Sequence, residues 1–152
     1  MKTLINGRWT DRKDEKQSND GSFKRKDTEF RNWITPDGSP GETGLGGFKA
    51  ESGRYHLYVS LACPWAHRTL IFRKLKNLEP HIGLSIVHPI MLENGWEFRT
   101  DFSQCTGDQI LGKNSIFEVY LAANKNITSR ASVPVLWDVK QATIVSNESS
   151  EI

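Results

Sequence analysis

Apolar and polar positions follow two different periods in the middle of the chain. The run YHLYVS at residues 55–60 is β-branched and aromatic, which is typical of a buried strand. Pro64 suits the first position of a helix. Apolar residues then recur at helical spacing, at Leu70, Ile71, Leu75 and Leu78. The run IGLSIVH at residues 82–88 is typical of a second strand. Strand, helix and strand in so short a stretch predict a βαβ unit with parallel strands.

The second half of the chain extends this pattern. A long loop over residues 89–112 leads to SIFEVYLAAN at 115–124, which has one apolar helical face. VPVLWD at 133–138 and ATIVS at 142–146 are short strands, and their close spacing predicts an antiparallel hairpin. The order βαβαββ predicts an α/β, thioredoxin-like sheet with helices on both faces. The final SNESSEI resembles a helix start, so the domain is expected to be truncated at the start of its last helix.

Residues 1–50 show no sustained helical or strand-like spacing of apolar residues. They are polar, mixed in charge and interrupted by glycine and proline, which favours an irregular, extended N-terminal arm over a folded domain. Four aromatic residues are candidates for pinning this arm to the body: Trp9, Phe23, Phe30 and Trp33. We therefore expect an arm at 1–50 and a thioredoxin-like domain at 51–152.

Composition narrows the class of protein. The 152 residues are 37% apolar and 25% charged, which fits one ordinary domain with a core. The net charge of +2 is too small to indicate a nucleic-acid partner. No apolar stretch reaches the roughly 18 residues of a membrane span, and no signal-peptide core is present, so we expect a cytoplasmic protein without a membrane partner. Two cysteines are too few for a disulfide framework, and we expect both as thiols.

Cys63 lies where the first strand gives way to the first helix. The first turn of a helix has unpaired N–H groups and the positive end of the helix dipole, which favour a thiolate over a thiol. The position three residues later, which holds a second cysteine in dithiol oxidoreductases, is Ala66 here. Any disulfide that Cys63 forms therefore requires an external thiol. The alternative is a buried, inert cysteine, and the βαββ context weighs against it.

Two further features point to a peptide-like ligand. In a thioredoxin-like sheet, the proline that opens the third strand is commonly cis, so we expect a cis bond at Val133-Pro134, with the backbone of Val133 turned toward Cys63. Such a backbone can pair with an extended ligand. Glu148 and Ser149, at the start of the last helix, suit the ammonium and carboxylate of an amino acid. A trans proline and an ordinary capping sequence are the alternatives that the residues leave open.

A metal site and a chemical role for the second cysteine have less support in the sequence than thiol chemistry at Cys63. Cys63 and His67 have the spacing of a ligand pair, but the chain has no second closely spaced Cys or His pair, and zinc takes three or four protein ligands. We therefore expect no metal site. Cys105 lies in a polar loop and is expected to carry no chemistry.

The motifs together resemble a known family. The runs FRNWIT, SLACPWAHRTL, ENGWEF, VPVLWD and TIVSNESSEI are similar to those of glutathionyl-hydroquinone reductases, the Xi class of glutathione transferases. The resemblance implies a thioredoxin-like domain, an all-helical C-terminal domain that is absent from the 152 residues, and a homodimer in the full-length form. It implies Cys63 as the catalytic residue. It also implies a set of glutathione contacts: Trp96, Arg130, Val133, Glu148 and Ser149.

The resemblance also implies a reaction. Glutathionyl-hydroquinones are reduced to hydroquinones with glutathione as co-substrate, through a mixed disulfide between Cys63 and glutathione. In this interpretation Val133 pairs with the tripeptide backbone. Glu148 and Ser149 hold the γ-glutamyl end, and Arg130 and Trp96 hold the glycine end. Two alternatives remain at this point: a monothiol, glutaredoxin-like deglutathionylase, and a glutathione-binding fragment without turnover.

Overall fold

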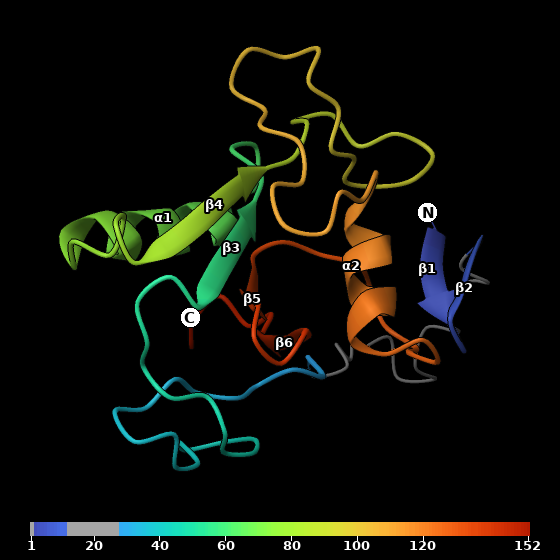
Figure 1. Cartoon of the computed structure of the whole chain (residues 1–152). Helices are drawn as coiled ribbons and strands as arrows, with labels where there is room; N and C mark the ends of the chain where they lie inside the picture. Colours follow the sequence, from blue (N-terminus) through green and yellow to red (C-terminus); the bar gives the residue numbers. More distant parts are fainter. Residues whose placement is uncertain (1, 12–27) are drawn as a thin grey trace, which may run out of the picture.

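The computed structural model describes residues 2–11 and 28–152 of the chain, and its centre is a four-stranded mixed sheet (Figure 1). The strands are β3 (Tyr55–Val59), β4 (Ile82–Ile86), β5 (Val135–Asp138) and β6 (Thr143–Ser146), in the order β4-β3-β5-β6. Strands β3 and β4 are parallel, whereas β5 is antiparallel to both β3 and β6. The predicted βαβ unit and the predicted hairpin are thereby confirmed.

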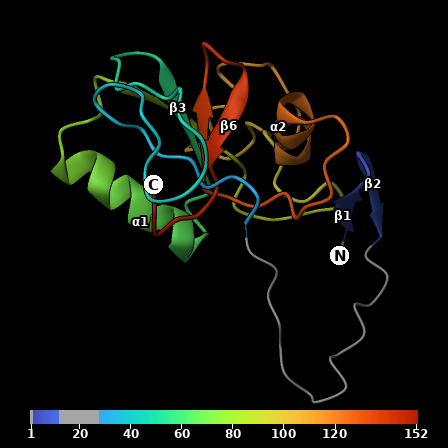
Figure 2. The same ribbon diagram turned by 90° about the horizontal axis from the view of Figure 1, so that it is seen from below.

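Strand β3 occupies the middle of the sheet, and all five of its residues are buried. Its side chains alternate between the two faces. Tyr55 and Leu57 lie on the face that is next to helix α1 (Pro64–Leu75). His56 and Tyr58 lie on the opposite face. Helix α2 (Ile116–Ala123) is on the other side of the sheet from α1, so helices cover both faces as predicted (Figure 2).

Helix α1 begins directly after Cys63, which is its N-cap residue, with Pro64 in the first turn. Its buried residues are Ala66 and Thr69, which are small and let the helix approach the sheet closely. The helix that the apolar spacing predicts is confirmed, but Ile71 and Leu75 are 48% and 69% exposed and do not face the core. Helical spacing shows that apolar residues share a face, but which face is buried depends on the position of the sheet.

Helix α2 is anchored by its start and by its buried face. The carboxylate of Glu118 accepts a hydrogen bond from the backbone N–H of Ser115, at 2.9 Å, and so caps the first turn. Ile116, Val119 and Tyr120 have no exposed surface. This short helix is therefore held by packing against the sheet, and a helix of this length needs that packing to be stable.

The N-terminal residues correct the expectation of an irregular arm. Lys2–Ile5 (β1) and Arg8–Asp11 (β2) form an antiparallel hairpin, drawn beside α2 in Figure 1. Asn6 and Gly7 between them have φ of 48° and 75°, the conformation of a type I′ turn. Leu4 is fully buried. The hairpin therefore packs on the body as part of the core.

Residues 28–53 run along the body without helices or long strands. The backbone N–H of Asn32 donates to the carbonyl of Val145 at 3.0 Å, which adds a short stretch to the edge of β6. Arg54 forms a buried ion pair with Asp138, at 2.5 Å, and also donates to the carbonyl of Gly47. Phe30 contacts the ring of Tyr120 edge-on.

Two predictions about the N-terminal region have different outcomes. Phe30 and Trp9 do pin their segments to the body, whereas Phe23 lies outside the described residues. The division of the chain at residue 50 stays a prediction.

Within the described ranges, no helix combines the length and the apolar character that a membrane crossing requires.

Candidate functional site

Cys63 and the Val133-Pro134 bond lie against each other at the start of α1. The Val133-Pro134 peptide bond is cis, as predicted. The sulfur of Cys63 lies 3.6 Å from the carbonyl oxygen of Val133. Cys63 is partly exposed, and its own carbonyl accepts the backbone N–H of His67 in the first turn of α1. A thiol that a ligand can reach thus lies next to a backbone segment that can receive a peptide.

The backbone at Val133 lies outside the sheet ladder. The pairing of β3 with β5 extends only to Tyr58 and Val135, so Val133 precedes the first paired residue of β5. Residues at the end of a ladder can form hydrogen bonds with an added extended segment. The position of Val133 therefore fits the predicted pairing with a tripeptide backbone.

Tyr120 joins two parts of the site, a role that sequence reasoning missed. Its hydroxyl donates to the carbonyl of Ser132, at 3.1 Å, and accepts from the side-chain amide of Asn147, at 2.9 Å. Ser132 precedes Val133, and Asn147 precedes Glu148. Burial raises the pKa of Tyr120, so the hydroxyl keeps its proton. A fully buried phenol thus sets the distance between the two predicted glutathione segments.

Glu148 and Ser149 begin the last turn of the described chain. The hydroxyl of Ser146 accepts the backbone N–H of Glu148 at 3.2 Å, and the N–H of Ile152 donates to the carbonyl of Glu148 at 3.1 Å. These are the cap and the first bond of a helical turn, which agrees with the predicted helix start. Ser149 is buried and Glu148 is partly exposed. The carboxylate of Glu148 also accepts from the hydroxyl of Ser150.

Trp96 and Arg130 occupy two loops outside the sheet. Trp96 is partly buried, and its carbonyl accepts the N–H of Ile116 at the start of α2. Arg130 lies three residues before Val133 and is exposed. Among the described residues, neither side chain forms a hydrogen bond or ion pair with Cys63. The structure thus brings Cys63, Val133, Glu148 and Ser149 into one connected unit, whereas the side chains of Trp96 and Arg130 lie on two loops outside it.

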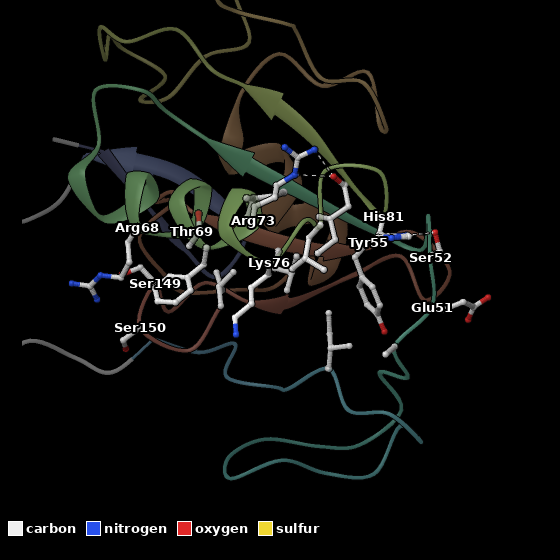
Figure 3. A pocket seen from close by; sticks show the side chains of 18 residues that line it. Glu51, Ser52, Tyr55, Arg68, Thr69, Arg73, Lys76, His81, Ser149 and Ser150 are labelled. Carbon is white, nitrogen blue, oxygen red and sulfur yellow. Dashed lines mark hydrogen bonds between the residues drawn. The ribbon is translucent and has the colours of Figure 1, made fainter.

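A large cavity lies on the α1 face of the sheet (Figure 3). Its volume is about 660 Å³, and its lining includes Tyr55, Thr69, Phe72 and Lys76. Of the predicted site residues, Ser149 contributes to this lining. The cavity therefore lies beside Ser149, and its lining does not include Cys63 or Val133.

No metal centre emerges in the described part of the chain. The side chains of His, Cys, Asp and Glu there form no group of three or more that could hold an ion. The chemistry that the arrangement offers comes instead from a thiol, backbone hydrogen-bonding groups and a carboxylate.

Comparisons with known proteins agree with this geometry. Residues 62–152, more than half of the chain, match the family "Glutathione S-transferase, N-terminal domain". The whole chain is 57% identical to the glutathionyl-hydroquinone reductase YqjG of Escherichia coli, and it covers 46% of that relative. This chain thus spans less than half the length of that curated protein.

Solved structures lead to the same family. The glutathione-bound structure of YqjG from Escherichia coli matches with a TM-score of 0.79 and 61% identity, over 80% of this chain and 40% of that one. A Xi-class glutathione transferase from Natrialba magadii matches with a TM-score of 0.82 and 43% identity, over 99% of this chain and 42% of that one. The resemblance and the thioredoxin-like fold that the motifs indicated are confirmed. The chain belongs to the glutathione S-transferase N-terminal domain family.

Proposed function

We propose that this chain carries the reactive thiol and the glutathione site of a glutathionyl-hydroquinone reductase. The observation that carries the proposal is the contact of the Cys63 sulfur with the Val133 carbonyl, 3.6 Å apart, at the N-terminus of α1. A helix N-terminus stabilises an anion, and a thiolate is the form of cysteine that attacks sulfur. The identity of 57% to a reductase of this name supports the substrate class.

The proposed reaction has two displacements. In the first, the thiolate of Cys63 attacks the sulfur of the glutathionyl-hydroquinone. A sulfur–sulfur bond forms, the sulfur–carbon bond breaks, and the ring carbon takes a proton to give the hydroquinone. In the second, a glutathione thiolate attacks the mixed disulfide, which releases oxidised glutathione and restores the thiolate of Cys63. The substrate carbon is reduced, and two glutathione sulfurs are oxidised to the disulfide.

The remaining site residues orient glutathione in this scheme. The backbone of Val133 pairs with the tripeptide beside the thiol. Glu148 and Ser149 hold the γ-glutamyl end, and their link through Tyr120 to the Val133 segment supports a shared role. Arg130 and Trp96 bind the glycine end, an assignment that rests on the family resemblance. A homodimeric longer form rests on that resemblance as well, whereas a cytoplasmic location stays the expectation from the sequence.

Mass spectrometry after incubation with oxidised glutathione tests the proposal. We expect one glutathione adduct, on Cys63. Cys105 serves as the internal control, because burial and the nearby Asp101 carboxylate raise the pKa of its thiol. Cys63→Ser should abolish the adduct, and Cys105→Ser should leave it unchanged. Equal adducts on both cysteines would contradict the assignment.

A substrate comparison separates this proposal from the glutaredoxin-like alternative. Both reactions use one thiol and one glutathione site, so the adduct alone does not distinguish them. A glutathionyl-hydroquinone and an S-glutathionylated peptide should be offered to the chain at equal concentration with glutathione. Faster turnover of the hydroquinone adduct supports the proposal, whereas faster turnover of the peptide supports general deglutathionylation.

A further inference from the structure

The β1–β2 hairpin contacts the two loops that carry Trp96 and Arg130. On one side, the ammonium of Lys2 forms an ion pair with Glu93, at 2.8 Å. The ring of Trp9 lies beside Gly95, where a Cβ would come within 3.5 Å of it. Glu93 and Gly95 belong to a tight turn that is closed by two backbone hydrogen bonds between Leu92 and Gly95. Trp96 is the next residue after this turn.

On its other side, the hairpin pairs with the segment before Arg130. The backbone groups of Leu4 and Ser129 exchange two hydrogen bonds, each of 3.0 Å, as in an antiparallel sheet. The carbonyl of Ser129 also accepts the hydroxyl of Thr3, at 2.9 Å. The N–H of Gly7 donates to the carbonyl of Ile127 at 2.9 Å. Arg130 follows directly after Ser129, so its backbone is held by the hairpin.

Trp9 is the central contact of this arrangement. Its ring stacks on Phe117 of α2, with 4.6 Å between ring centroids and 9° between planes. Its indole N–H is buried and has no hydrogen-bond partner among the described residues. The packing of the ring, rather than a hydrogen bond, therefore fixes its position, and another flat aromatic ring should serve the same purpose.

We propose that the hairpin is a positioning element of the glutathione site, which fixes Trp96 and Arg130 relative to each other by holding the turn at 92–95 and the segment at 127–129. The inference rests on the proposed function and extends it. Two long loops from distant parts of the sequence need a common support if they are to grip one end of a small ligand. The hairpin provides that support, and Trp9 is its principal positioning residue.

The test is the affinity of the 152-residue chain for glutathione, measured by calorimetry. Trp9→Ala should weaken glutathione binding about tenfold, and Trp9→Phe should bind within twofold of the unaltered chain. The rate at which iodoacetamide alkylates Cys63 should stay within twofold in both variants, since the thiol is held by α1 and not by the hairpin. A general loss of structure would change both the glutathione affinity and the rate of Cys63 alkylation. A change in affinity alone therefore indicates a positioning role.

Two further variants guard against a trivial loss of folding. Gly7→Ala puts a Cβ against the carbonyl oxygen of Lys125 and should weaken glutathione binding by moving the hairpin away from the Arg130 segment. Phe48→Ala removes a buried aromatic residue from the segment that pairs with Thr35 and should destabilise the chain without changing glutathione affinity more than twofold. If Trp9→Ala does not unfold cooperatively, the glutathione affinity of Gly7→Ala decides whether the hairpin positions the site.

The outcomes distinguish a failure of the proposed function from a failure of the positioning role of the hairpin. Absence of glutathione binding by the unaltered chain contradicts the proposed function itself. Normal binding by the unaltered chain together with equal binding by Trp9→Ala and Gly7→Ala overturns the positioning role alone. Parallel losses of affinity and of Cys63 alkylation, or an equal loss of affinity in Phe48→Ala, would also overturn it, because they would show only a general structural effect.

Discussion

The two faces of the central sheet differ in how completely they are packed. On the α2 face, Tyr120 and Ile116 are fully buried, and Trp9 stacks on Phe117. On the α1 face there is a cavity of about 660 Å³, and Phe72 of α1 is 53% exposed. Tyr120 and the hairpin, which hold the segments of the predicted glutathione contacts, belong to the packed face. The α1 face contributes the thiol through the start of its helix. The contacts that hold the Val133 and Glu148 segments together therefore lie on the packed side of the sheet.

The largest expected effect is the loss of a side chain from the packed face. Tyr120→Ala removes a fully buried aromatic ring and should lower the free energy of unfolding by about 3–5 kcal/mol. Phe72→Ala is the matched change on the open face, and it should cost less than about 1 kcal/mol because half of that ring is already in water. Urea denaturation of both variants measures the difference. Equal losses would contradict the contrast between the faces.

A smaller loss of stability is expected at acidic pH, and its origin is a histidine on the packed face. His56 lies buried on this face, with its Nε2 2.7 Å from the hydroxyl of Ser85. Burial lowers the pKa of His56 from 6.5 to about 4, and Arg73 also lowers this pKa, whereas Asp108 opposes the shift. The unfolded chain therefore binds a proton between pH 6.5 and pH 4 that the folded chain does not, so stability is lost as the pH falls through this window.

The size of the acid effect follows from the pKa shift. His56 should account for a loss of about 2 kcal/mol in the free energy of unfolding between about pH 7.5 and about pH 4.5. Denaturation curves at the two pH values give the total change, and the same curves for His56→Gln show the part that remains without the imidazole. A pH dependence that is identical in the two chains would refute the role of His56.

The smallest change in structure sharpens the link between packing and function. Tyr120→Phe keeps the ring but removes the hydroxyl that bonds Ser132 and Asn147, with an expected loss of about 1–2 kcal/mol in stability. It should weaken glutathione binding about tenfold, because the Val133 and Glu148 segments lose their common tie. Tyr55→Phe is the control, since its hydroxyl bonds the carbonyl of Lys49 on the open face. Calorimetry should show unchanged affinity for that variant, and a similar loss in both would contradict the link.

The β1–β2 hairpin has a local signal in the sequence that the composition of its surroundings obscures. Asn-Gly at residues 6 and 7, between short apolar and polar alternations, is the strongest short-range indication of a type I′ turn. The polar, charged composition of residues 1–50 favours an irregular arm instead. Strands β1 and β2 have four residues each, and so short a hairpin is marginal alone. Leu4 and Trp9 stabilise it only by packing on the body, which composition does not reveal.

The sequence by itself determined the elements from residue 55 onward and the place of the thiol. The βαβαββ order, the pairings of those strands and the N-cap position of Cys63 follow from local patterns, because turn residues, proline and hydrophobic period act on neighbouring residues. The cis bond at Val133-Pro134 is expected from the thioredoxin-like sheet, while the residues alone leave a trans bond open. Tertiary structure decided which face of α1 is buried, how Tyr120 joins the Val133 and Glu148 segments, and how the hairpin supports Trp96 and Arg130. These are contacts between residues far apart in the chain, and their geometry exists only once the sheet has brought those segments together.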